Sequence, residues 1–185
     1  MNKSINLKAI VVENKENEVI IRFNRPEIRS PLTIAVLGEI DKILDTISDE
    51  TIVFTGTDDV FASGADLREI ANVTGETAKD YALRGQNLMK KIESKNAIAF
   101  VNGLCFGGAL DLALSCKKRI ATPNATFCHP GANLGIMTGW GGTQRLPRLI
   151  GEAKALEMLL TAKRVDAKEA LRIGLIDEIR EFLLS

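Results

Sequence analysis

Apolar residues along this chain alternate between the two-residue spacing of strands and the three-to-four-residue spacing of helices. Two short apolar runs, 9–12 and 18–23, flank a polar turn and predict a pair of strands. Over 33–48, isoleucines and leucines recur at helical spacing and predict an amphipathic helix. The same patterns predict strands at 51–55, 97–101 and 119–121, an extended segment at 125–129, a glycine-rich loop at 135–142, and helices over 75–95, 108–115, 143–150, 152–161 and 166–173.

Two glycine turns stand out because each follows a predicted strand. Gly107 and Gly108 stand where a helix begins, and the second turn, Phe61 to Leu67, comes after the strand predicted at 51–55, which Gly56 closes. The first amides of a helix have no internal acceptor and can bind an anion or a developing oxyanion. Asp111 lies about one helical turn after Gly108 and can face the same pocket. An amide donor beside a carboxyl group favours chemistry on a carbonyl compound.

Five sequence motifs together resemble those of the crotonase superfamily, also called the enoyl-CoA hydratase/isomerase family. They follow in family order at family spacing over nearly all of the chain. They are Phe23-Asn24-Arg25-Pro26-Glu27, Phe61-Ala62-Ser63-Gly64-Ala65-Asp66-Leu67, Val101-Asn102-Gly103 through Gly107-Gly108-Ala109, Gly139-Trp140-Gly141-Gly142-Thr143-Gln144-Arg145-Leu146-Pro147, and Gly174-Leu175-Ile176-Asp177.

The resemblance implies an α/β fold, a crotonase-like spiral of stacked ββα units, and a recurring strand, strand, helix order agrees with it. We expect a single crotonase-like domain over 1–185, with its core at about 7–179. Family members usually continue with more helices after the Gly174 region. We therefore expect the C-terminal helical segment, which carries oligomer contacts in the family, to be truncated.

Composition narrows the class of partner. The chain has 24 basic residues (lysine plus arginine) and 24 acidic residues (aspartate plus glutamate). Its net charge is therefore zero, and it lacks the excess of positive charge that would indicate binding to nucleic acid or an anionic membrane. The three cysteines, Cys105, Cys116 and Cys128, lie in apolar or mixed segments and read as buried thiols of a reducing compartment. Without a signal-like apolar start or a membrane-spanning run, we expect a cytoplasmic protein.

By resemblance, the amides of Ala65 and Gly108 form an oxyanion hole for a thioester oxygen. Either turn alone reads as a simple link between a strand and a helix, but the pair at family spacing favours the oxyanion hole. Asp111 aligns with the first of two catalytic glutamates and is one carbon shorter. Its alternative role is a helix-start carboxylate stabilised by the helix dipole.

The second family glutamate falls on Gly131, which has no acid or base. A two-carboxylate hydration therefore cannot be carried over intact. His129, the only histidine, is a candidate replacement base, although a half-buried polar residue on a strand is the simpler interpretation. Trp140 either lines the acyl pocket or anchors its loop, and anchoring is the commoner role for a lone tryptophan.

The resemblance also implies a coenzyme A thioester as the substrate, with no metal and no redox cofactor. The segment Glu27, Ile28 and Arg29 aligns with the part that lines the CoA nucleotide, and Arg25, Arg29 and Arg68 are candidate phosphate partners. The remaining expected substrate-binding residues are Ser63, Asp66, Leu67, Gly107, Gly131 and Trp140.

Three functions remain open at this point. The first is an acyl-CoA enzyme of enoyl-CoA hydratase/isomerase type, acting through a thioester enolate. The second is an isomerase or decarboxylase, favoured by Gly131 because such reactions run with one carboxylate or none. The third is a non-catalytic acyl-CoA-binding protein of the same fold. We expect a homo-oligomer, a trimer or hexamer, by family habit.

Overall fold

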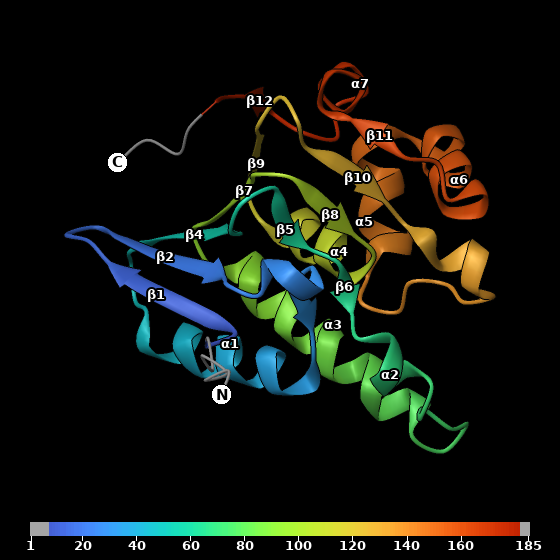
Figure 1. Ribbon diagram of the computed structural model, residues 1–185, viewed down its shortest axis with the longest axis horizontal. Coiled ribbons are helices and arrows are strands. Elements are labelled where there is room, and N and C mark those ends of the chain that lie inside the picture. Colours follow the sequence, from blue (N-terminus) through green and yellow to red (C-terminus); the bar gives the residue numbers. More distant parts are fainter. Residues whose placement is uncertain (1–7, 182–185) are drawn as a thin grey trace, which may run out of the picture.

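The computed structural model describes residues 8–181, and its largest sheet has six strands (Figure 1). The strand order is β1-β2-β4-β7-β9-β12. The first pair is antiparallel, and each later neighbour is parallel. The strands are β1 Ile10–Asn14, β2 Glu18–Phe23, β4 Thr51–Thr55, β7 Ala97–Val101, β9 Lys118–Ala121 and β12 Glu178–Ile179.

Two smaller sheets are formed by segments that lie in the chain between strands of the large sheet. One has the order β11-β10-β8-β5, and the other joins β3 to β6. Parallel pairing of β8 with both β5 and β10 brings three separate loops to the same edge. The strands are β3 Pro31–Leu32, β5 Val60–Ala62, β6 Gly64–Ala65, β8 Leu104–Phe106, β10 Thr126–Cys128 and β11 Val165–Asp166.

The helices fall into two groups around the sheets in Figure 1. Helices α1 and α3 pack against each other, and α4 packs against both α3 and α5. Helices α5, α6 and α7 lie at the opposite end, beside β10 and β11. The helices are α1 Ile34–Thr46, α2 Leu67–Ile70, α3 Ala78–Ser94, α4 Gly108–Ser115, α5 Gly142–Ile150, α6 Glu152–Thr161 and α7 Ala167–Arg172, with 3-10 turns at Pro26–Ile28 and Pro130–Leu134.

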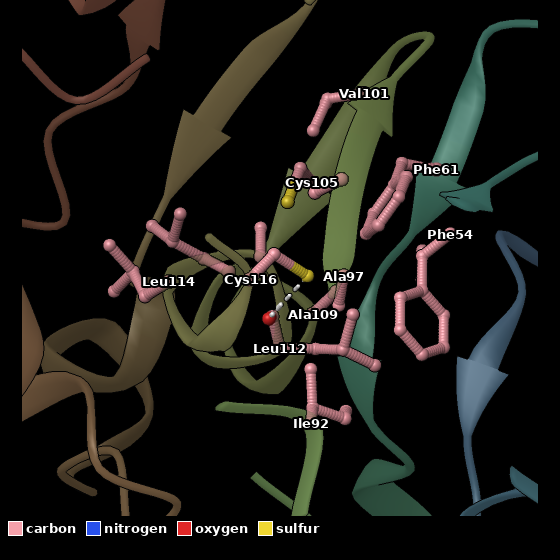
Figure 2. Close-up of a cluster of buried hydrophobic side chains, with 14 of the residues drawn as sticks. Phe54, Phe61, Ile92, Ala97, Val101, Cys105, Ala109, Leu112, Leu114 and Cys116 are labelled. Carbon is pink, nitrogen blue, oxygen red and sulfur yellow. Dashed lines mark hydrogen bonds between the residues drawn. The ribbon is translucent and has the colours of Figure 1, made fainter. Parts of the chain in front are cut away.

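Every residue of α4 is buried, so this helix forms the centre of the core. Figure 2 shows Ala109 and Leu112 of α4 among side chains from β4, β5, β7 and β8. The thiol of Cys116 donates a 3.5 Å hydrogen bond to the carbonyl oxygen of Leu112. All three cysteines are free and buried, as the sequence predicts. Because α4 is fixed on all sides, groups at its start are held rigidly.

The predicted long elements agree with the structure within a few residues, and the shortest elements were missed. Strands β3, β5, β6, β8, β11 and β12 have two or three residues, too few to show a period. The extended segment predicted over 125–129 ends at Cys128, because Pro130 starts a 3-10 turn. The four-residue helix α2 was not predicted, and α3 begins at Ala78 rather than at 75.

Candidate functional site

A cavity of about 330 Å³ lies where the two glycine turns meet the loop before α5. Its walls are mostly apolar, and its polar side chains lie near the start of α4. The turn before α2 contributes Ser63 and Ala65, and the turn before α4 contributes Gly107 and Gly108. A concave apolar pocket with a few converging polar groups is the usual form of a small-molecule site.

The amide nitrogens of Ala65 and Gly108 are neighbours, although the residues lie on different strand–helix turns. A Cβ atom on Gly108 would lie 3.3 Å from the Ala65 nitrogen, and one on Gly64 would lie 2.7 Å from the Gly108 nitrogen. Gly64 and Gly107 have φ values of 91° and 54°, which favour glycine. Gly108 is the first residue of α4, so its amide has no acceptor within the helix. The predicted pair of amides is therefore brought together.

Asp111 is completely buried on the first turn of α4 and lines the cavity. The hydroxyl of Thr138 donates a short hydrogen bond to its Oδ2 atom. Burial raises the pKa of Asp111 from 3.8 to about 7, against the lowering effects of that hydrogen bond and of the Arg145 charge. A carboxyl group with a pKa near neutrality can both give and accept a proton.

His129 lies beside Asp111, with its Nε2 atom 3.5 Å from Asp111 Oδ1. The side chain is buried rather than half-buried, and it stands just after β10 rather than within a strand. Burial lowers its pKa from 6.5 to about 4, so the imidazole is neutral at pH 7. His129 is therefore part of the cavity's polar end, which corrects the simpler interpretation made from its sequence context.

Two glycines shape the space around this pair. A Cβ atom on Gly142 would overlap Asp111 Oδ1 and would lie 3.0 Å from His129 Nε2. Gly131 also lines the cavity, and a Cβ atom there would lie 2.5 Å from the carbonyl oxygen of Ile136. The polar end of the cavity contains the Asp111 carboxyl group, the His129 imidazole and the Thr138 hydroxyl.

Trp140 both lines the cavity and anchors its loop, so its two predicted roles coexist. Its indole is buried over Gly85 of α3 and Gly108 of α4, where any Cβ atom would overlap the ring. The ring of Tyr81 lies 6.0 Å from it, centroid to centroid. These contacts close one wall of the cavity with aromatic surface.

The other expected substrate-binding residues divide into two groups. Ser63, Leu67 and Gly107 line the cavity. The residues of the second group do not line the cavity. Some of them precede β3, which pairs with β6. The Arg29 carbonyl also accepts a 2.9 Å hydrogen bond from the Ser63 amide. That pairing places the loop before β3 next to the cavity. The second group is Glu27, Ile28, Arg29, Asp66 and Arg68.

Asp66 and Arg68 form an ion pair at the start of α2, with 2.6 Å between Arg68 Nη2 and Asp66 Oδ2. The Arg68 side chain is 82% exposed, whereas the Asp66 side chain is 5% exposed. The Arg68 hydrogen bond holds the pKa of Asp66 at about 2. Asp66 also caps α2 by accepting the Arg68 amide, so its role in this structure is to shape the turn.

Sequence reasoning missed several residues of the cavity. Tyr81 lines the cavity, but the sequence places it only within the helix predicted over 75–95. The apolar side chains of the loop before α5 gave no periodic signal, and they are exposed beside the cavity. They are Leu134, Ile136 and Met137.

The three mainly parallel sheets, their helices and the neighbouring amides of Ala65 and Gly108 define a protein of the crotonase type. A family model described as "Enoyl-CoA hydratase/isomerase" matches residues 13–181. Crotonyl-CoA hydratase of Syntrophomonas wolfei is 38% identical, over 92% of this chain and 68% of that protein. Short-chain-enoyl-CoA hydratase of Clostridium acetobutylicum is 34% identical, over 95% and 70%.

Solved structures agree with these relatives. The enoyl-CoA hydratase of Bacillus anthracis superposes with a TM-score of 0.87 at 34% identity, over 94% of this chain and 70% of that one. The enoyl-CoA hydratase of Thermoplasma volcanium gives a TM-score of 0.89 at 29% identity, over 94% and 72%. The chain belongs to the enoyl-CoA hydratase/isomerase family, and its function is of that type.

Among residues 8–181, no helix is long and apolar enough to cross a membrane. In the same range, no three side chains of histidine, cysteine, aspartate or glutamate gather closely enough to hold a metal ion.

Proposed function

We propose that this protein hydrates short-chain 2-enoyl-CoA thioesters, with Asp111 as an acid–base residue. The observation that carries the proposal is the buried Asp111 carboxyl group, one helical turn from the neighbouring amides of Ala65 and Gly108. The names of relatives at 34–38% identity support the short-chain enoyl substrate.

The two amides would hold the thioester oxygen of the substrate. When water adds to C3 of a 2-enoyl thioester, negative charge moves to that oxygen. Two fixed donors stabilise the enolate, and loss of one such donor costs roughly 3 kcal/mol of activation free energy. The mostly apolar cavity would take the acyl chain and exclude bulk water, which strengthens these hydrogen bonds.

Asp111 would exchange the proton that the reaction needs, and its pKa of about 7 suits that task. Position 131 carries no second carboxylate, so the proposed catalytic pair of Asp111 and Gly131 would be atypical for the family. A hydration mechanism in this protein therefore needs a different second group.

The loop at Glu27, Ile28 and Arg29 would line the nucleotide of CoA, beside the cavity mouth at Ser63. Arg68 is exposed and free to approach a phosphate, although Asp66 neutralises part of its charge. We further propose that the reaction uses no metal or redox cofactor, and that the protein is a cytoplasmic homo-oligomer, either a trimer or a hexamer.

A second candidate function is isomerisation or decarboxylation of an acyl-CoA. The observation that favours it is the crowding at Gly131, where the Ile136 carbonyl oxygen leaves no room for a carboxylate side chain. A shift of a double bond needs one group that removes and returns a proton, which Asp111 alone supplies.

The test is turnover of crotonyl-CoA, followed as loss of the enoyl-thioester absorbance, for wild type, Asp111→Asn and the control Asp80→Asn. Asp80 is an exposed aspartate on α3, so its replacement should leave the rate unchanged. We expect wild type and the control to hydrate crotonyl-CoA, and Asp111→Asn to lose at least about 100-fold in kcat.

Analysis of the reaction products distinguishes the hydratase from the isomerase, the decarboxylase and the non-catalytic binding protein. Conversion of a 3-enoyl-CoA to a 2-enoyl-CoA without hydration would favour the isomerase, and carbon dioxide release from a carboxyacyl-CoA would favour the decarboxylase. Binding of acyl-CoA by wild type without any turnover would favour the non-catalytic binding protein.

A further inference from the structure

Two buried polar atoms at the end of the cavity lack hydrogen-bond partners and lie close to each other. Among residues 8–181, Asp111 Oδ1 and His129 Nε2 each have no hydrogen-bond partner, and 3.5 Å separates them. Asp111 is fully buried, and His129 is 3% exposed. Unsatisfied buried polar groups are costly, and each such group in a folded protein needs an explanation.

The surroundings fix which oxygen of Asp111 is available. Thr138 donates its hydroxyl to Oδ2, so that oxygen acts as an acceptor. The backbone amides of Trp140 and Gly142 also act on this carboxyl group and lower its pKa. Oδ1 nevertheless has no hydrogen-bond partner, so it is the oxygen left to carry a proton, 3.5 Å from His129 Nε2. Gly142 lies against both atoms, and its missing side chain leaves space for them to approach.

We propose that Asp111 and His129 share one proton and act as a single acid–base unit, in which His129 takes the place of a second carboxylate. This inference rests on the proposed function for its catalytic half, whereas the shared proton stands on geometry alone. One carboxyl group and one neutral imidazole together hold one proton, as two carboxyl groups sharing a proton would.

With this pair, one group accepts the proton that hydration releases and the other supplies the proton that hydration consumes. His129 accepts a proton from water as the water oxygen bonds to C3 and the C2–C3 π electrons move toward the thioester oxygen. The enolate then collapses, and C2 receives the proton of Asp111. The pair begins and ends with one proton, which returns to Asp111 from His129 across the 3.5 Å gap. Water and enoyl thioester become the 3-hydroxyacyl thioester, with nothing oxidised or reduced.

Two other proton-carrying groups near the pair have pKa values above 9, so they keep their protons at neutral pH. Burial raises the pKa of Tyr81, from α3, to about 12. Burial also raises the pKa of Cys105, from β8, well above its ordinary value. Arg145, from α5, acts as a fixed positive charge that lowers the pKa of Asp111. The pKa values of about 7 for Asp111 and about 4 for His129 place one proton on the pair just below neutrality.

The shared proton can be tested without any turnover. His129 is the only histidine in the chain, so an untagged protein gives one set of imidazole signals. These signals are followed by nuclear magnetic resonance from pH 5 to 9 in wild type, Asp111→Asn and Asp80→Asn. We expect a transition near pH 7 in wild type and in the Asp80→Asn control, and its loss in Asp111→Asn. An unchanged titration in Asp111→Asn overturns the proposal.

The catalytic half is tested with His129→Gln, which keeps a neutral polar side chain but cannot take a proton. We expect kcat on crotonyl-CoA to fall roughly 100-fold or more, with KM close to that of wild type. Full kcat in a folded His129→Gln protein, checked by circular dichroism, overturns the catalytic half. Should wild type fail to turn over any enoyl thioester, the proposed function falls, and the resonance experiment still decides whether the proton is shared.

Discussion

The carbonyl oxygen of Ile136 would lie 2.5 Å from a Cβ atom at Gly131, so the loop before α5 closes over the position where the family pattern places a glutamate. The present loop therefore excludes a carboxylate side chain at this point. A glutamate at position 131 would therefore fit only if the Ile136 segment moved.

We therefore predict that Gly131→Glu lowers the free energy of unfolding by about 1–3 kcal/mol and does not raise hydratase activity. The measurement is urea unfolding together with the crotonyl-CoA assay. Gly38→Ala is the matched control, because Gly38 is an exposed position in α1 with no heavy atom within 4 Å of its Cβ direction. Wild-type stability in Gly131→Glu would show that the Ile136 segment yields easily.

Thr138 should tune the pKa of Asp111 through its hydroxyl. Thr138→Val removes the hydrogen bond that lowers this pKa, so the pKa should rise above about 7. Turnover needs the Asp111 proton, so activity should be lost as pH rises through the pKa of Asp111. In the variant this loss should occur at a higher pH than in wild type. The pH profile of kcat measures the shift, and Thr138→Ser should keep the wild-type profile. A Thr138→Val profile equal to wild type would contradict the assignment.

Gly142 should be required for the geometry of the Asp111–His129 pair. Gly142→Ala places a methyl group against Asp111 Oδ1 and 3.0 Å from His129 Nε2. We expect kcat to fall by about 100-fold, because a displacement of about 1 Å at a catalytic group has that effect. Gly75→Ala, in an exposed loop with open space, is the control and should keep wild-type kcat. Equal kcat values for the two variants would argue against a precise requirement for the pair.

The pH dependence of stability should reveal the two opposing shifts of the pair. The pKa of Asp111 is raised from 3.8 to about 7, so the folded state binds the extra proton in this range and stability falls as pH rises. The pKa of His129 is lowered from 6.5 to about 4, so the unfolded state binds the extra proton and stability rises with pH. Between about pH 4 and 6.5 the two contributions offset each other.

Single variants should separate these contributions. Asp111→Asn should gain stability as pH rises from 4 to 6.5, and His129→Gln should lose stability from pH 4 to 7, each by a few kcal/mol at most. Urea unfolding at pH 4.5, 6 and 8 measures both, with Asp80→Asn as the control that follows wild type. Parallel curves for all four proteins would contradict the assigned shifts.

Trp140 should report ligand binding, because it is the only tryptophan and its buried indole lines the cavity. We expect saturable change in its fluorescence when butyryl-CoA is added, and a much smaller change with CoA lacking an acyl group. Titration of both ligands measures the difference. No response to butyryl-CoA at concentrations that bind by calorimetry would place the acyl group elsewhere.

The sequence alone determined the elements that depend on local spacing. Apolar periodicity predicted the helix at 33–48 and the strands at 51–55 and 97–101, because side-chain spacing encodes which face is buried. The order and spacing of the motifs indicated the family, and the resemblance in turn implied paired amides at Ala65 and Gly108. The helix predicted over 166–173 also agrees with the structure, where the Asp166 side chain caps it by accepting a hydrogen bond from the Glu169 amide.

Only the tertiary structure decided what depends on contacts between distant segments. Short strands such as β6 and β8 exist because partners from elsewhere in the chain supply their hydrogen bonds. The packing of β10 against β8 places His129 beside Asp111, and the loop before α5 brings Thr138 to the same carboxyl group. The burial that shifts both pKa values is a property of the assembled core, so residue spacing could name Asp111 and His129 but could not pair them.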